Sequence, residues 1–194
     1  MLTPHAGDTR LAMDEIDNPL PILVAPHRAL KTKARAVAAP DMDRVRLLVP
    51  RMFAAMYAAP GIGLAAPQVD VGLRLAIVDL MPGDTRQPMV LVNPEILQVS
   101  AEWVVREEGC LSLPNQYAEV GRPAMVRVGY TDLDGKANQI DAEGLMAACL
   151  QHEIDHLDGV LFVDHISVLK RNILMRKLAK EQKLAKAGGP GKAS

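Results

Sequence analysis

Residues 73–141 contain a succession of short β-rich runs with no helical pattern between them. The runs cover residues 75–79, 89–92, 96–99, 103–105 and 125–131, and Pro and Gly residues separate them. The dipeptide Asp134-Gly135, which follows the last run, is typical of a tight turn. Because consecutive strands without intervening helices usually pair with their neighbours in antiparallel fashion, this stretch predicts a mainly antiparallel sheet.

Before this stretch, apolar residues recur at helical spacing. Asp41 precedes them as a possible N-cap, and Gly61 ends the pattern. The apolar positions are Val45, Leu48, Met52, Phe53, Met56 and Tyr57. Pro50 lies inside the pattern, and because proline lacks a backbone N–H, it should kink this helix or separate its first turns.

Two further helices are expected after the strands. The first covers residues 142–157, with Asp141 as a possible N-cap and Asp158-Gly159 at its end. The second covers residues 167–186 and has one apolar stripe among basic residues. The stripe consists of Leu169, Ile173, Leu174, Leu178 and Leu184. The predicted fold class is α+β, with mainly antiparallel sheets packed around a central helix (142–157) and a C-terminal helix.

The length of 194 residues predicts a single domain that can bury a core without disulfides. We expect this domain to cover 1–187, with 1–18 as a poorly ordered extension and 188–194 as a disordered tail. Two cysteines exclude a disulfide framework. No apolar run is long enough to span a membrane, and the acidic N-terminus lacks the apolar region of a secretory signal. A cytoplasmic protein is therefore expected, and Met1 and Met13 both stay possible starts.

The formal net charge of −1 hides an asymmetry along the chain. Residues 170–194 carry eight Lys or Arg residues and a single acidic residue, Glu181. Their net charge is +7, so residues 1–169 carry −8. A basic segment of this kind is typical either of a solvated surface or of a contact with nucleic acid.

The expected central helix contains His152-Glu153-Ile154-Asp155-His156, which has the pattern H-E-x-x-H. Residues at i and i+4 share a helix face, so both imidazoles can reach one metal ion. Glu153 would lie near the same ion and could take a proton from a bound water. A pair of surface histidines with a solvated Glu is the alternative, and the Glu at this position favours the metal site.

A catalytic metal site usually has a third protein ligand. His165 lies beyond the expected helix end, which favours a surface position. Cys110 follows the permissive Gly109 and is a suitable kind of ligand, although a single Cys is also typical of a core. Cys149 lies on the same helix face as His152 and would crowd the ion, so we expect it in the wall beside the metal.

Three segments together carry a family resemblance. They are Gly61-Ile-Gly-Leu-Ala-Ala-Pro-Gln68, Glu108-Gly-Cys-Leu-Ser112 and Gln151-His-Glu-Ile-Asp-His-Leu-Asp-Gly159. In this order and without a mismatch, they resemble the three signature motifs of peptide deformylases. The resemblance extends from about Pro21 to Arg176. It implies a hydrolase that removes the formyl group from the N-terminal formylmethionine of nascent bacterial chains and releases formate.

The resemblance also implies the roles of individual residues. The implied metal ligands are Cys110, His152 and His156. They would hold one Fe(II) ion per chain, which Zn, Ni or Co can replace, and a thiolate with two imidazoles suits such metals. Glu153 would take a proton from the attacking water and return it to the leaving amine. The side chain of Gln68 and the backbone N–H of Leu111 would stabilise the oxyanion.

Substrate contacts follow from the same resemblance. The peptide backbone should run alongside Gly63 and Gly109, where missing side chains permit a close, strand-like approach. The methionine pocket would be built from Ile62, Leu145 and Cys149. An ion pair between Glu108 and Arg122 would hold the loop that carries the Cys ligand.

The implied partners are the formyl-Met nascent peptide and, through the basic C-terminal helix, the ribosome surface. A monomer that contacts no membrane is expected. Two alternatives remain from the residues alone: a metalloprotease that cleaves internal peptide bonds, and a noncatalytic, ribosome-associated metal protein. The protease would need a downstream His or Glu ligand, and the noncatalytic protein would be expected to lack Glu153 or Gln68.

Overall fold

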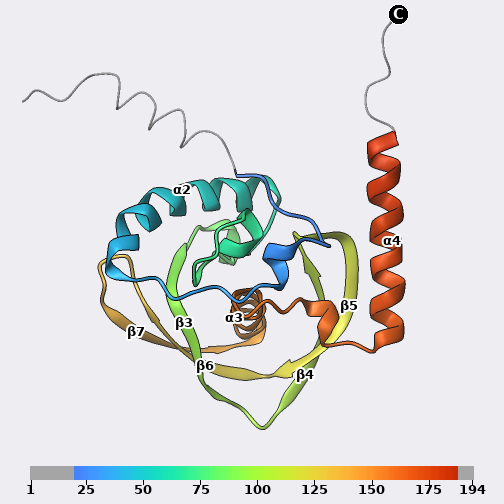
Figure 1. Cartoon of the computed structure of the whole chain (residues 1–194). Coiled ribbons are helices and arrows are strands. Elements are labelled where there is room, and N and C mark those ends of the chain that lie inside the picture. Colours follow the sequence, from blue (N-terminus) through green and yellow to red (C-terminus); the bar gives the residue numbers. More distant parts are fainter. Residues whose placement is uncertain (1–19, 188–194) are drawn as a thin grey trace, which may run out of the picture.

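The computed structural model describes residues 20–187, so the expected N-terminal extension and disordered tail lie outside the described residues (Figure 1). The α-helices are α2 (Met42–Ala58), α3 (Gly144–Leu157) and α4 (Val168–Ala187). The strands are β1 (Gly63–Ala65), β2 (Leu75–Val78), β3 (Met89–Val99), β4 (Trp103–Cys110), β5 (Leu113–Pro123), β6 (Met125–Thr131) and β7 (Ala137–Glu143).

The strands form two antiparallel sheets around α3. One has five strands in the order β1-β2-β3-β6-β7, and the other consists of β4 and β5. Figure 1 shows α3 near the middle of the molecule with strands around it and α2 across the other side of β1 and β2. The apolar residues of α3, among them Leu150, Ile154 and Leu157, pack with Val78, Leu91 and Val128 of the large sheet. The predicted α+β class is confirmed.

Strand boundaries differ from the prediction in ways that polar residues explain. The two runs over 89–92 and 96–99 form the single strand β3, whose register shifts after Val92 and Ile96. Asn93, with a φ of +52°, lies at the first shift and separates the two runs in the sequence pattern. The sequence pattern missed β1, β5 and β7, since β1 has three residues and β7 alternates mostly polar side chains. The predicted turn after β6 is present, with Gly135 at a φ of +82°.

The predicted start of α3 is wrong by two residues. Ala142 and Glu143 belong to β7, and α3 begins at Gly144, whose φ of +60° makes the bend from strand to helix. Asp141 caps no helix; it pairs across the sheet with Arg127, whose Nε lies 2.6 Å from its Oδ1. The predicted end of the helix at Asp158-Gly159 is confirmed.

Helix α2 runs without interruption through Pro50, so the predicted separation of its first turns is wrong. The 3-10 turn Ala39–Asp41 lies directly before the helix. Asp41 does not cap α2 with its side chain. It accepts a hydrogen bond from the Ala38 N–H at 2.9 Å and forms two charged hydrogen bonds of 2.7 Å with Arg35.

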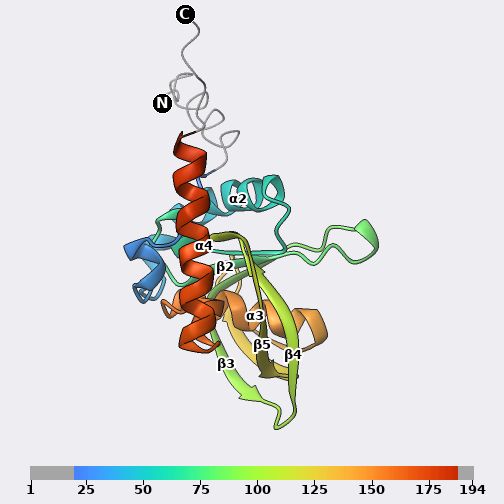
Figure 2. The ribbon, with the colours of Figure 1, turned by 90° about the vertical axis from the view of Figure 1, so that its right-hand side faces the viewer.

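Helix α4 begins at Val168, one residue after the predicted start, and Ser167 accepts a hydrogen bond from the Lys170 N–H there. Figure 2 shows α4 lying along the outside of the body beside β5. The predicted apolar stripe does not pack as one unit. Leu178 is buried and Leu174 half-buried, whereas the side chains of Leu169, Ile173 and Leu184 are exposed. The contact between α4 and the body therefore involves only part of the predicted apolar stripe.

None of the helices that the structure describes is long and apolar enough to cross a bilayer.

Candidate metal centre

The two histidines of the H-E-x-x-H motif meet the cysteine that ends β4. One donor atom each of Cys110, His152 and His156 lies within 4.8 Å of the others, and Cys110 Sγ is 3.2 Å from His156 Nε2. A change of register between Gly109 and Cys110 ends the regular pairing of β4 with β5. One thiolate and two imidazoles at these separations suit a borderline divalent metal, so the residues present fit the implied ion.

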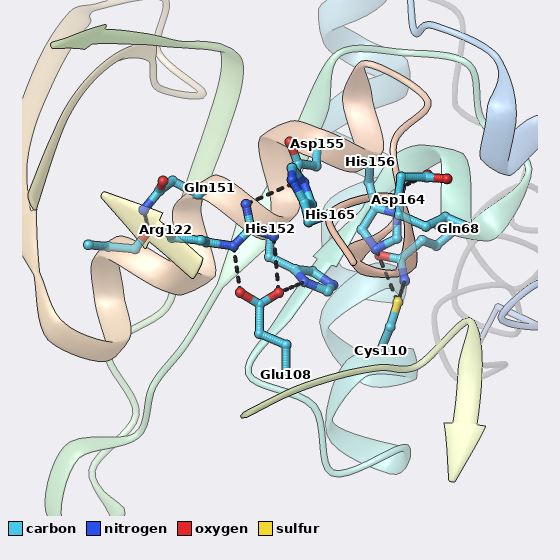
Figure 3. Close-up of polar contacts among 12 residues, drawn as sticks. Gln68, Glu108, Cys110, Arg122, Gln151, His152, Asp155, His156, Asp164 and His165 are labelled. Atoms are coloured by element: carbon cyan, nitrogen blue, oxygen red, sulfur yellow. Dashed lines mark hydrogen bonds and ion pairs between the residues drawn. The ribbon is translucent and has the colours of Figure 1, made fainter. Parts of the chain in front are cut away.

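The other two ligand candidates lie elsewhere. His165 Nε2 is 2.7 Å from Asp155 Oδ2, so His165 contacts Asp155 and is not one of the three clustered donors (Figure 3). Cys149 is buried beside the cluster, and its Sγ lies 3.8 Å from the carbonyl oxygen of Ile62. Burial raises the pKa of the Cys149 thiol, so this side chain stays a neutral wall residue.

A buried ion pair anchors one imidazole of the cluster. Glu108 Oε2 lies 3.1 Å from His152 Nδ1 and accepts a 3.0 Å hydrogen bond from Arg122 Nη2 (Figure 3). Burial by itself would raise the pKa of Glu108, but the hydrogen bonds from His152 and Arg122 lower it to about 2. Glu108 is therefore ionised at neutral pH, and it holds His152 through Nδ1 and leaves Nε2 for a metal ion.

Glu153 lies at the same cluster with a carboxylate that other residues do not satisfy. Its side chain is buried, and Oε2 has no hydrogen-bond partner among the described residues. Burial raises the pKa of Glu153 to about 7, and Asp155 and Glu108 add to this, while His152 and Arg122 oppose it. A carboxyl group with this pKa can both accept and donate a proton near neutral pH.

Gln68 points its amide group toward the cysteine. It lies in the 3-10 turn Ala66–Val69, and its Oε1 accepts a 2.8 Å hydrogen bond from the Ala65 N–H. Its Nε2 then donates to Ser112 Oγ at 3.1 Å and lies 3.6 Å from Cys110 Sγ. Since three partners fix the amide, Gln68 presents an N–H donor beside the donor cluster. The remaining oxyanion candidate, Leu111, follows Cys110 directly and lines the same cavity.

A cavity of about 650 Å³ opens onto Glu153, His152, Cys110 and Gln68. All five predicted substrate-contact residues line it: Ile62, Gly63, Gly109, Leu145 and Cys149. Its walls come from the ends of β1 and β4, the β5 start and the first turns of α3. Within residues 20–187, the strands β1 and β4 each pair on one side only, so both offer a free edge near the cavity.

The two glycines have tighter roles than the sequence suggested. A Cβ atom on Gly63 would lie 2.3 Å from Glu153 Oε1, and one on Gly109 would lie 2.7 Å from the ring of Tyr117. The space of the missing side chains is thus filled by Glu153 and Tyr117. Sequence reasoning missed Tyr117, although its pairing with Gly109 could have been found once β5 was recognised as the partner of β4.

Sequence reasoning also assigned no role to Asp155 and Ser112, which contact the site. Ser112 lies in the motif Glu108–Ser112 and Asp155 in the motif Gln151–Gly159. Their places inside these motifs could have identified them as site residues. Asp155 Oδ2 accepts a 2.8 Å hydrogen bond from Arg122 Nη1, and Ser112 holds Gln68.

Comparison with known proteins agrees with this geometry. The family model described as polypeptide deformylase matches residues 19–172. A peptide deformylase of Mesorhizobium japonicum is 52% identical over 173 residues, covering 89% of this chain and 96% of the relative. One from Zymomonas mobilis is 49% identical over 170 residues, with coverage of 85% and 96%.

Solved structures give the same result. The crystal structure of a peptide deformylase from Legionella pneumophila superposes with a TM-score of 0.82 at 44% identity, covering 89% of this chain and all of the other. One from Synechococcus elongatus, solved in complex with actinonin, gives a TM-score of 0.78 at 41% identity, with coverage of 83% and 88%. The motifs, the fold and these relatives agree: the chain belongs to the peptide deformylase family of hydrolases.

Proposed function

We propose that this chain hydrolyses the formyl amide of N-terminal formylmethionine on nascent polypeptides and releases formate. The observation that carries the proposal is that Glu153 lines the same cavity as Cys110 and His152 of the Cys-His-His cluster. The carboxylate oxygen without a partner supplies a base, and the three donors supply a place for a Lewis acid.

Cys110, His152 and His156 would hold the ion. When bound, a divalent metal would polarise the formyl oxygen and make a water molecule more acidic. Fe(II) is proposed as the physiological metal, with Zn, Ni or Co as substitutes and one ion per chain. Burial lowers the pKa of His156, and a neutral imidazole is the form that binds metals.

Glu153 moves the proton during the reaction. As a carboxylate it accepts the proton of the attacking water, and as a carboxylic acid it donates that proton to the departing amine. A positioned acid–base group of this kind contributes on the order of 10²–10⁴ in rate. Its raised pKa keeps both forms accessible near neutral pH.

Gln68 and Leu111 are proposed to stabilise the oxyanion that develops on the formyl oxygen. The fixed Nε2 of Gln68 and the backbone N–H of Leu111 are the two donors, and both residues line the cavity. Removing one such donor costs about 10²–10³ in kcat.

The peptide is proposed to lie as an added strand between the free edges of β1 and β4, next to Gly63 and Gly109. The methionine side chain would enter the apolar end of the cavity, which Ile62, Leu145 and Cys149 line. Because the relative from Synechococcus elongatus binds actinonin, we expect this cavity to take actinonin too.

The test is an assay of formate release from a formyl-Met peptide, with protein purified without oxygen and its metal content measured. We expect formate from formyl-Met peptides, no fragments from an acetylated control peptide and inhibition by actinonin. Glu153→Gln should lose about 10²–10⁴ of kcat while keeping its metal. Full activity of Glu153→Gln, or cleavage of internal peptide bonds, would contradict the proposal.

We also propose that the basic face of α4 binds the ribosome. The side chains of Lys170, Lys177, Lys180 and Lys183 are exposed, so they can reach RNA phosphates. Truncation after Ser167 would test this poorly, since it removes the buried Leu178 as well. Charge reversal of Lys177 and Lys180 should weaken ribosome binding, most at low salt, and leave turnover of small formyl peptides unchanged. Unchanged ribosome binding of this variant at low salt would contradict the proposal.

A further inference from the structure

The sequence offered His165 as a possible metal ligand, and the proposed mechanism gives this residue no role. It follows the 3-10 turn Phe162–Asp164, beyond the end of α3. Its side chain is about one-third exposed, and its Nε2 lies 2.7 Å from Asp155 Oδ2. Asp155 is the residue of α3 directly before His156. His165 therefore contacts the motif helix at a residue that does not line the cavity.

Asp155 passes this contact on to Arg122. The same oxygen, Asp155 Oδ2, accepts a 2.8 Å hydrogen bond from Arg122 Nη1. Nε and Nη2 of Arg122 both donate to Glu108, which is the geometry of a paired guanidinium and carboxylate. The side chains of Arg122 and Glu108 are 8% and 9% exposed, so solvent screens this part of the network only weakly.

Glu108 completes the connection to the donor cluster. Its Oε2 lies 3.1 Å from His152 Nδ1, whereas Nδ1 of His156 has no partner among the described residues. Polar contacts therefore orient only one of the two imidazoles through its second nitrogen, and that orientation depends on where Arg122 holds Glu108. Figure 3 shows the series of side chains from His165 through Asp155 and Arg122 to Glu108 and His152.

The segment that carries His165 supports His152 in a second way. The ring of Phe162 stacks against the ring of His152, with centroids 6.5 Å apart and planes 21° apart. Phe162 is buried and Asp164 accepts hydrogen bonds from the Leu161 N–H and from Lys31, so this turn is firmly attached. The turn can therefore hold the outer end of the network in place.

We propose that His165 is a positioning residue of the metal centre, acting on His152 through Asp155, Arg122 and Glu108. The inference rests on the proposed metal site. Without His165, Asp155 loses a partner for Oδ2 and can turn toward solvent, and the guanidinium of Arg122 then loses one of its two anchors. Outer residues that orient a metal-bound His typically change metal affinity by about 10–100-fold.

The test measures metal binding itself. The metal affinity of His165→Leu, His165→Gln and wild type is measured by competition with a chelator, and the visible spectrum of each Co(II)-loaded protein is recorded. We expect His165→Leu to bind metal about 10-fold more weakly, with an altered Co(II) spectrum. His165→Gln, which keeps an N–H donor, should recover most of both. His27→Leu is the control, because His27 accepts a hydrogen bond from Ala29 on another surface.

The outcomes separate the two hypotheses. If wild type binds no metal, the proposed function fails. If wild type binds metal and His165→Leu matches it in affinity and spectrum, only the role of His165 is overturned. Should His165→Leu fail to fold, Asp155→Asn takes its place, since it keeps the shape and removes the charge facing Arg122. Weaker metal binding by a folded Asp155→Asn supports the network, and wild-type binding overturns it.

Discussion

Single atoms decide whether the candidate centre can form, and Gly63 shows this most clearly. The Glu153 carboxylate occupies the space of a side chain at position 63, and Cys149 Sγ lies 3.0 Å from the same point. Glu153 is the proposed base, so its exact place matters for the reaction. Gly63 lies on β1, an edge strand of three residues. A glycine is required there because the Glu153 side chain of α3 occupies the space that a Cβ atom would need.

Gly63→Ala should lower kcat/KM by roughly 10²-fold, because displacement of a catalytic group by about 1 Å has this effect. The variant should stay folded, since the strain can be relieved by movement of Glu153. Gly72→Ala is the matched control, because no described residue apart from its two chain neighbours has an atom within 4 Å of the added Cβ. Equal losses in the two variants, measured by formate release and far-UV circular dichroism, would show that the effect is not specific to Glu153.

Asp79 is a second residue whose environment makes a prediction. It is completely buried and accepts hydrogen bonds from the Tyr57 hydroxyl at 2.6 Å and from the N–H groups of Met81 and Gln87. Burial would raise the pKa of Asp79, but these hydrogen bonds lower it overall. The stability that it contributes is therefore present above the unfolded pKa of about 3.9 and is lost as the pH falls through the lower folded value.

Tyr57→Phe should reduce the free energy of unfolding by about 1–3 kcal/mol at pH 7, since it removes a hydrogen bond to a charged group. The difference from wild type should shrink as the pH falls below about 4 and through the lowered folded pKa of Asp79, where the folded protein takes up the proton. Urea unfolding of both proteins at pH 7 and pH 3 measures this. A difference that is the same at the two pH values would contradict a role for the charge of Asp79.

At the scale of elements, α4 illustrates how one helix serves two surfaces. Its inner side buries Leu178 against Leu30, Leu113 and Phe162, and Gln182 donates a 2.9 Å hydrogen bond to the carbonyl oxygen of Ala25. Glu181, the only acidic residue of the basic segment, accepts a 3.1 Å hydrogen bond from the buried Gln116. The acidic residue is thus used for attachment, and the outer side is left basic.

Leu178→Ala should reduce the free energy of unfolding by about 2–5 kcal/mol, the usual cost of a cavity in a core. Leu184→Ala is the matched control on the same helix, because Leu184 is 61% exposed and should change stability by less than about 0.5 kcal/mol. Chemical denaturation of both variants measures the difference. Similar small effects would mean that α4 is attached by its polar contacts alone.

For the molecule as a whole, secondary structure and site residues could be predicted from the sequence wherever a single segment contains the pattern that identifies them. The periodicity of α4, the turn at Asp134-Gly135 and the motif residues of α3 are local features, and the structure has them in place. Strand β7 was missed because its side chains are mostly polar, and its backbone pairing with β6 is not recorded by any local pattern. The Asp155–Arg122 contact was missed for the same reason, since it joins residues 33 apart.

The candidate metal centre joins parts that are far apart in the sequence, and this sets the last prediction. Cys110 ends β4 of the small sheet, whereas His152 and His156 belong to α3 beneath the large sheet. An ion bound by all three would connect the two sheets through α3, and only the folded chain brings the donors together. Binding to the folded state alone adds about 4 kcal/mol at a free metal concentration of 1,000 times Kd.

Removal of the metal with a chelator should therefore lower Tm by roughly 8–16 °C for a chain of this size. Restoring the metal should return Tm to its starting value. Cys110→Ser should show a much smaller difference between metal-loaded and metal-free protein, since it loses the thiolate. Differential scanning calorimetry with and without chelator measures both. A wild-type Tm that does not respond to the chelator would show that the two sheets are held together by packing alone, without help from an ion at this centre.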